Sequence, residues 1–187
     1  MKRKYSEIDD SEKENVYRYK HHIYFYSDVT RDSCFQLIKC IEKCKHYIQK
    51  KSVKDSIYIH ICSDGGDLLS SLSVVDYILN SKTDIITICE GSVASAGVLI
   101  SLAGKKRCIT KHSYMLIHEL RGFCYGKYTE CQDDMKNNDI LMKDMIKYIQ
   151  QRCKHPYLQK NLKTILKQDI LWNANKCLKY GLVTKII

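Results

Sequence analysis

Short runs rich in β-branched and aromatic residues, some with alternating apolar and polar positions, are followed by longer stretches with the apolar spacing of a helix. Three such runs, 22–26 (HIYFY), 56–62 (SIYIHIC) and 85–89 (IITIC), have the composition of β-strands. Helical spacing follows the first two, at 33–50 and 67–80. Further along, the pattern predicts short strands near 107–110 and 114–118, a long helix over 129–153 and a shorter helix after Pro156. The alternation of strands and helices predicts an α/β fold with crossover connections.

The helix predicted at 67–80 begins directly after a glycine-rich turn. Asp67 is placed to cap its N-terminus. Gly65 and Gly66 would let backbone N–H groups approach a ligand closely, and the helix start adds a partial positive field. Asp-Gly-Gly is also ordinary turn chemistry, so this turn alone indicates no function. The residues expected on the inward face of the helix are Leu68, Leu72, Val75 and Leu79.

The first residues differ in character from the rest of the chain. Residues 1–20 are polar, carry charges of both signs and show no period, which predicts a mobile N-terminal arm. The remaining residues, 21–187, have a length that suits one domain, and the chain is 44% apolar. The longest apolar-rich run, 93–103, is far shorter than the ~20 residues that span a bilayer. The N-terminus also lacks the apolar core of a secretory signal, so we expect no membrane partner.

Positive charge gathers near the C-terminus. The formal net charge is +10, and residues 141–187 hold ten Lys and Arg against two Asp, a net +8. These basic residues alternate with apolar ones along predicted helices, as in LQKNLKTILKQ, and form no uninterrupted basic block. Solvated helix faces explain this pattern, so we do not expect nucleic acid as a partner, although the charge would attract acidic molecules.

Ten cysteines occur in a chain that shows neither a C-x-x-C pair nor an export signal. Disulfide frameworks belong to small secreted proteins, so these thiols are expected to be reduced. Cys40 and Cys44 would share a helix face near His46, but no second pair stands at metal-ligand spacing. We therefore expect buried free thiols, no metal and no other cofactor. The expected location is the cytoplasm or another reducing compartment, and organellar or viral-host origins fit equally well.

A serine and a histidine stand where two predicted strands end. Ser95 lies in Val-Ala-Ser-Ala-Gly before an apolar helical segment, where its hydroxyl could cap the helix or join the Ala96 N–H in a reactive site. In SYMLIHEL (113–120) the apolar strand pattern ends at His118, and an imidazole at the end of a buried strand needs a partner. The H-E-x-x-H zinc motif fails after His118, and Val93 replaces the first glycine of G-x-S-x-G. These failures exclude the matching zinc protease and the α/β-hydrolase fold.

Four motifs in this order resemble those of the ClpP-type serine peptidases, the proteolytic subunits of Clp proteases. The family's strand and S-P-G-G turn appears as ICSDGG at 61–66, and its A-S-M-G turn as VASAG at 93–97. Its M-I-H strand appears as MLIH at 115–118, and its terminal Asp, aromatic residue, small-residue helix and Y-G-L-V as DILWNANKCLKYGLV at 169–183. The likeness runs from about residue 22 to the C-terminus.

The resemblance implies a ClpP/crotonase-like α/β fold of repeated strand-turn-helix units. It implies a single peptidase domain over 21–187, with a protruding strand-helix handle at about 122–153 that meets the opposite ring. Family members assemble as two stacked heptameric rings of identical subunits, degrade polypeptides and receive them from an AAA+ ATPase unfoldase. The same partners are therefore expected for this chain.

The resemblance also implies a catalytic Ser-His-Asp triad of Ser95, His118 and Asp169. A serine hydroxyl needs a base to take its proton, and a carboxylate behind the imidazole fixes its tautomer. The residue pattern alone does not distinguish Asp169 from the other aspartates of the second half of the chain. The backbone N–H groups of Gly66 and Ala96 are implied as the oxyanion hole.

The leading hypothesis is a serine endopeptidase that hydrolyses peptide bonds through an acyl-enzyme at Ser95. The main alternative is a catalytically idle ClpP-like subunit with a structural or regulatory role in a ring. Such a subunit would have no chemical need for all three triad residues. An acyl-CoA enzyme of the related crotonase fold and a nucleic-acid-binding protein are the remaining alternatives.

Overall fold

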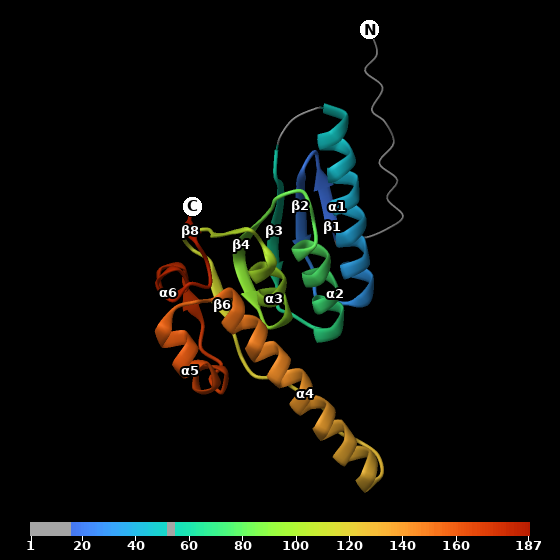
Figure 1. The fold of residues 1–187 in the computed structure, drawn as a ribbon, viewed down its shortest axis with the longest axis vertical. Coiled ribbons are helices and arrows are strands. Elements are labelled where there is room, and N and C mark those ends of the chain that lie inside the picture. Colours follow the sequence, from blue (N-terminus) through green and yellow to red (C-terminus); the bar gives the residue numbers. More distant parts are fainter. Residues whose placement is uncertain (1–15, 52–54) are drawn as a thin grey trace.

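The computed structural model describes residues 16–51 and 55–187, which build a β-sheet flanked by helices (Figure 1). In these residues the strands are β1 (Val16–Tyr19), β2 (His22–Tyr26), β3 (Ile57–Ser63), β4 (Ile85–Ala94), β5 (Lys106–Ile109), β6 (Tyr114–Leu116), β7 (Trp172–Asn173) and β8 (Lys185–Ile186). The sheet order is β1-β2-β3-β4-β5-β8, with β6 paired to β4 and β7 paired to β6. Strands β2 to β5 are parallel neighbours, so the connections between them are crossovers.

The helices in the same residues are α1 (Arg31–Lys51), α2 (Leu68–Leu79), α3 (Ala96–Ala103), α4 (Tyr128–Arg152), α5 (Pro156–Leu166) and α6 (Ala174–Lys179). Helix α1 packs against β1, β2 and α2, and α2 packs against α3. The C-terminal part of helix α4 packs against α3, and its N-terminal part extends away from the body (Figure 1). None of these helices, within the described part of the chain, is long and apolar enough to cross a membrane. The predicted α/β class is confirmed.

The core lies between the sheet and the helices that cover one of its faces. Ile23 and Phe25 of β2 are fully buried, as are Ile57, Ile59 and Ile61 of β3. The residues that alternate with them along β3 are half-buried. This period of two directs the largest apolar side chains toward α1 and α2. Burying each of these side chains contributes about 1.5–3 kcal/mol. The fold therefore requires apolar residues at these positions, and their alternation is visible in the sequence.

The ordered chain begins earlier than the sequence pattern indicates. Val16–Tyr19 were expected to belong to the mobile arm, but they form β1 and pair antiparallel with β2. Val16 is buried in the core, but one buried apolar residue is too short a pattern to predict a strand. Residues 1–15 of the expected arm lie outside the described residues.

The buried face of α2 is rotated from the expected one. Leu79 is exposed, whereas Val74 and Ile78 are buried together with Ser71. The Ser71 hydroxyl donates to the carbonyl of Leu68 at 2.6 Å, so a polar side chain can occupy the core face without losing its hydrogen bond. The predicted cap is confirmed, since the Asp67 side chain accepts the Ser70 N–H.

The expected handle contains its long helix, α4, but no strand. Residues 121–127 precede α4 as an irregular segment, and no strand of the described chain runs beside them. Lys127 N–H donates to the Glu130 carboxylate at 2.9 Å, which caps the start of α4. A lone extended segment has no ladder partner, and Phe123 and Tyr125 project into solvent with about nine-tenths of their surface exposed.

Arg152 ties the end of α4 to the end of α3. Its guanidinium donates to the carbonyls of Leu102 (2.8 Å), Ala103 (3.4 Å) and Gly104 (2.9 Å). The last carbonyls of a helix lack partners within it, and a cation there also interacts favourably with the helix dipole. The C-terminal half of α4 is therefore fixed against α3, which begins directly after Ser95.

None of the ten cysteines, all of which lie in the described residues, forms a disulfide, and seven of them are buried. Burial raises the pKa of Cys89 and of Cys177 to about 12 each, and that of Cys153 to about 11. The cause is the loss of hydration that a thiolate would suffer in the core. The prediction of buried free thiols is confirmed for these positions.

These thiols predict a loss of stability at alkaline pH. A thiol whose pKa is higher in the folded chain than in the unfolded chain stabilises the fold fully below the unfolded pKa of about 8.5. That contribution is lost as pH rises toward the folded pKa of about 12. We expect the free energy of unfolding, measured with urea, to fall between pH 8 and pH 10 by on the order of 1 kcal/mol for each such thiol.

The control is Cys89→Ala, which creates a small cavity at every pH but removes one titrating group. Its unfolding free energy should therefore fall less steeply with pH than that of the unaltered chain. Equal slopes, or a constant stability up to pH 10, would contradict this account.

Candidate active site

Two strand-to-helix turns lie against each other at one edge of the sheet. Strands β3 and β4 are parallel neighbours, and Ser63 pairs with Val93 where both strands end. The Gly65-Gly66 turn therefore lies beside the turn that carries Ser95. A Cβ atom added to Gly65 would stand 2.5 Å from the Ser95 Cβ, and the Gly65 φ of +100° disfavours any other residue. The contact leaves no room for a side chain at residue 65.

Ser95 has an unusual backbone conformation. Its φ is 53° and its ψ is −124°, and it immediately precedes α3. Its N–H donates to the carbonyl of Leu116 at 2.9 Å, so β6 helps to hold the turn. The hydroxyl makes no capping hydrogen bond to α3, which argues against the interpretation of Ser95 as an N-cap. A positive φ at a residue other than glycine costs on the order of 1–3 kcal/mol, and such residues cluster at functional sites.

Two backbone N–H groups beside Ser95 lack acceptors. Val29 bridges the neighbouring turn, since its N–H donates to Gly65 O and its carbonyl accepts from Asp67 N–H, both at 2.7 Å. That pairing leaves the Gly66 N–H without an acceptor in the described part of the chain. The N–H of Ala96, in the first turn of α3, has none there either. Both groups can therefore bind an oxygen that carries negative charge.

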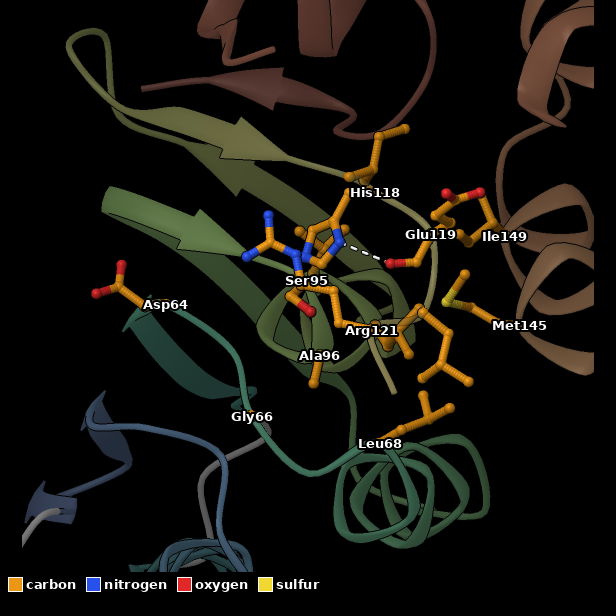
Figure 2. Close-up of a pocket in the computed structure, with 14 residues that line it drawn as sticks. Asp64, Gly66, Leu68, Ser95, Ala96, His118, Glu119, Arg121, Met145 and Ile149 are labelled. Carbon is orange, nitrogen blue, oxygen red and sulfur yellow. Dashed lines mark hydrogen bonds between the residues drawn. The ribbon is translucent and has the colours of Figure 1, made fainter. Parts of the chain in front are cut away.

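His118 follows β6 and lines the same pocket as Ser95 (Figure 2). Its Nδ1 lies 2.7 Å from the carbonyl oxygen of Glu119. Because a carbonyl oxygen only accepts, Nδ1 carries the hydrogen of the neutral ring, which leaves Nε2 with a free lone pair. This tautomer is the one that a general base needs.

The carboxylate of Asp169 contacts a residue other than His118. Strands β6 and β7 are antiparallel with Met115 opposite Trp172, but the register does not continue, because the Glu119 N–H donates to the Leu166 carbonyl at 2.8 Å, two residues out of step. The Asp169 carboxylate instead accepts from the Arg121 guanidinium at 2.7 Å. Within the described residues it makes no hydrogen bond to His118 and does not line the pocket. The structure thus brings Ser95, His118, Gly66 and Ala96 together, without Asp169.

The pocket beside Ser95 has an apolar interior and a charged rim, with a volume of about 270 Å³. Helix α4 contributes Met145 and Ile149, one helical turn apart, and Figure 2 shows both side chains turned toward the pocket. The remaining apolar lining is Leu68, Ala96, Val98, Leu99, Ile117 and Leu120, and the charged residues are Asp64, Glu119 and Arg121. Such a pocket suits an apolar side chain of a ligand whose backbone passes Ser95.

Sequence reasoning did not identify the pocket residues of α4 or the role of Arg121 as a partner of Asp169. Met145 and Ile149 are spaced like ordinary core residues of a helix, and only the docking of α4 against α3 directs them toward Ser95. Arg121 lies in an irregular segment, where no periodicity indicates which side chain it will meet.

In the described residues, no group of three or more His, Cys, Asp or Glu side chains is arranged to hold a metal ion. Cys40 and Cys44, weighed above as ligands, are buried on α1. The chemistry available beside Ser95 is therefore that of a hydroxyl, an imidazole and backbone N–H groups.

The comparison with known proteins identifies a family. Residues 11–187 match the Clp protease family. The chain belongs to that family. Its mixed sheet and helices agree with the ClpP/crotonase-like fold of Clp proteases, which confirms the expected fold.

One relative is the ATP-dependent Clp protease proteolytic subunit 3 of Synechococcus sp. (strain CC9902). It is 27% identical over 143 residues, which cover 75% of this chain and 71% of the relative. Together with the family match, this similarity makes the chain a ClpP-type peptidase subunit, as the motifs indicated.

The contact between the two turns predicts that Gly65→Ala damages the site. The new Cβ would overlap the Ser95 Cβ in a turn that already requires a positive φ. We expect a loss of about 1–3 kcal/mol in the free energy of unfolding. Amide hydrogen exchange should also accelerate at residues 94–97. Both effects are measurable by urea unfolding and by exchange with mass spectrometry.

Gly91→Ala is the matched control, because Gly91 also has a positive φ but an added Cβ would come only within 3.3 Å of the Cys62 sulfur. That variant should leave exchange at 94–97 unchanged. Equal acceleration in both variants would show that the contact with Ser95 is unimportant.

Proposed function

We propose that this Clp-family chain is a serine endopeptidase in which Ser95 is the nucleophile, His118 the general base and Asp169 the group that orients His118. The observation that carries the proposal is the conformation of Ser95, whose φ of 53° sets its hydroxyl in a strand-to-helix turn without a capping role. Strand-to-helix turns with strained serines present the hydroxyl for attack on a carbonyl. In the described residues, the N–H groups next to Ser95 lack acceptors and can bind the carbonyl oxygen during this attack.

The reaction begins when His118 Nε2 takes the proton of the Ser95 hydroxyl as the oxygen attacks the peptide carbonyl carbon. The imidazolium then gives that proton to the leaving amine, and the acyl group stays on Ser95 as an ester. A water molecule, deprotonated by His118 in the same way, hydrolyses the ester and restores the serine. The protonated Nδ1 of His118 supports this role for Nε2.

The N–H groups of Gly66 and Ala96 bind the oxyanion of the tetrahedral intermediate. Each donor of this kind typically contributes about 2.7–4 kcal/mol to transition-state stabilisation. The free state of both groups supports the assignment. Gly66 suits the role because its φ of +139° is a backbone conformation that glycine tolerates.

Asp169 completes the triad when its carboxylate turns from Arg121 to the Nδ1–H of His118. The position of Arg121 supports this move, since Arg121 holds Asp169 and lines the same pocket as His118. A carboxylate at Nδ1 stabilises the imidazolium that forms during proton transfer. The assignment to Asp169 also follows the family motif at 169–183.

The substrate is a polypeptide that places an apolar side chain in the pocket lined by Met145 and Ile149. Membership in the Clp protease family supports a ring-forming protease, with stacked heptameric rings as the proposed assembly. The exposed aromatic side chains of Phe123, Tyr125 and Tyr128 at the far end of α4 support a contact with other subunits. The name of the Synechococcus relative supports an ATPase partner that delivers substrates. Ten cysteines without a disulfide suit a reducing compartment, such as the cytoplasm.

The proposal predicts that a fluorophosphonate probe labels the chain at Ser95. Ser95→Ala should abolish labelling and peptide cleavage, because no hydroxyl remains to form the covalent bond. Asp169→Asn should lower the labelling rate by about 10⁴-fold, since a neutral amide does not stabilise the imidazolium that forms at His118. Labelling is read by mass spectrometry of the digested chain, and cleavage with an unstructured peptide.

Ser92→Ala is the matched control, because Ser92 lies in β4 three residues before Ser95 and is also half-buried. It should be labelled like the unaltered chain. Labelling that persists in Ser95→Ala would contradict the assignment. A chain that assembles but is neither labelled nor able to cleave peptides would instead indicate the idle ring subunit.

A further inference from the structure

We propose that Arg121 is a positioning residue that competes with His118 for Asp169 and so lowers the rate of acylation at Ser95. This inference rests on the proposed function, because it concerns the same triad. It goes further in giving the chain an internal restraint on its own activity, built from a side chain that neither reacts nor binds the nucleophile.

Two hydrogen bonds define the restrained state. The Arg121 guanidinium donates to the Asp169 carboxylate at 2.7 Å. The Nδ1–H of His118, which the carboxylate would otherwise accept, donates to the Glu119 carbonyl at 2.7 Å. Both members of the expected Asp-His pair thus have other partners, although each partner lies within three residues of His118 in the chain. One exchange of partners would form the Asp169–His118 bond.

Arg121 links Asp169 to the pocket that contains His118. Its guanidinium binds the Asp169 carboxylate, and Arg121 and His118 line the same pocket. The Glu119 N–H also donates to the Leu166 carbonyl at 2.8 Å, which fixes the segment after His118 beside the end of α5. The exchange needs the Asp169 side chain to leave Arg121 and turn toward His118.

Arg121 pairs with Asp169 although two other carboxylates share its pocket. Asp64 and Glu119 line the pocket with Arg121, and in the described residues neither makes an ion pair. Figure 2 shows the Arg121 side chain extending across this pocket. Of the three carboxylates, the guanidinium thus contacts the one that the proposed triad needs.

The restraint is weak enough to be reversible. The side chains of Arg121 and Asp169 are 72% and 58% exposed. Ion pairs this exposed change an equilibrium by about two- to fivefold, and salt screens them. A substrate, a neighbouring subunit or ionic strength can therefore release Asp169, which a buried ion pair would not allow.

The test compares Arg121→Met with the unaltered full chain by the rate of fluorophosphonate labelling at increasing probe concentration. Methionine keeps the length and packing of the side chain but removes its charge. We expect the maximal labelling rate to rise by about two- to fivefold, with the half-saturating probe concentration unchanged. Arg121→Lys, which keeps the charge, should retain most of the restraint. Raising the salt concentration should speed labelling of the unaltered chain but not of Arg121→Met.

Two controls separate this effect from a general loss of positive charge. Lys136→Met removes an equally exposed cation, 72% exposed and paired with Asp133 on α4, and should leave the rate unchanged. In an Asp169→Asn background, Arg121→Met should no longer raise the rate, because the carboxylate for which the residues compete is gone.

Labelling at equal rates in Arg121→Met and the unaltered chain would overturn the inference and leave the proposed peptidase intact. A rise that persists in the Asp169→Asn background would also overturn it, since Arg121 would then act without Asp169. Failure of every variant to be labelled would overturn both proposals.

Discussion

The Cα of Gly65 approaches Ser95 so closely that a single added carbon would overlap the serine Cβ, and this contact determines the local architecture of the site. It exists because β3 and β4 are parallel neighbours whose carboxyl ends meet at the same edge of the sheet. Packing of the glycine turn against the serine turn keeps Ser95 in its strained conformation. The bridge between Val29 and Gly66 completes the arrangement, since it uses the flanking backbone groups and leaves the Gly66 N–H available.

The remaining parts of the site depend on how other elements dock onto this edge. Strand β6 pairs with the end of β4 and so brings His118 beside Ser95. Helix α4 is attached to the end of α3 through Arg152, and its inner face supplies the apolar pocket. The pocket and the nucleophile thus share α3 as a common support. The side chains of Arg121 and Asp169 are exposed, so a change of partner there costs little free energy.

Much of this arrangement was predictable where a local rule decides the outcome. The strands that carry Ile59 and Phe25 follow the period of two, and Asp67 caps α2 as its position indicates. Ser95 was singled out by its small-residue turn before a helix and His118 by its place at the end of a buried strand, and their proposed roles came from the family motifs. Leu79 was misplaced because a hydrogen-bonded serine occupies the core face of α2, which hydropathy alone does not reveal.

Other features were not predictable because they depend on tertiary contacts. Strand β1 is defined by its pairing with β2 more than by its own short pattern. The partner of Asp169 is decided by where an irregular segment crosses the pocket, and no periodicity reports that path. The assignment of Asp169 to the triad came from a family motif, and it stays a proposal because its carboxylate contacts Arg121 in this structure.

The central claim is that Ser95 is a nucleophile beside a preformed oxyanion hole. The most direct measurement is a crystal structure of the full chain treated with a peptide boronate or aldehyde carrying an apolar terminal residue. The account predicts a covalent bond from the Ser95 Oγ, with an inhibitor oxygen about 2.7–3.1 Å from the N–H groups of Gly66 and Ala96. Electron density for an inhibitor attached to another residue, or bound without a covalent bond, would contradict it.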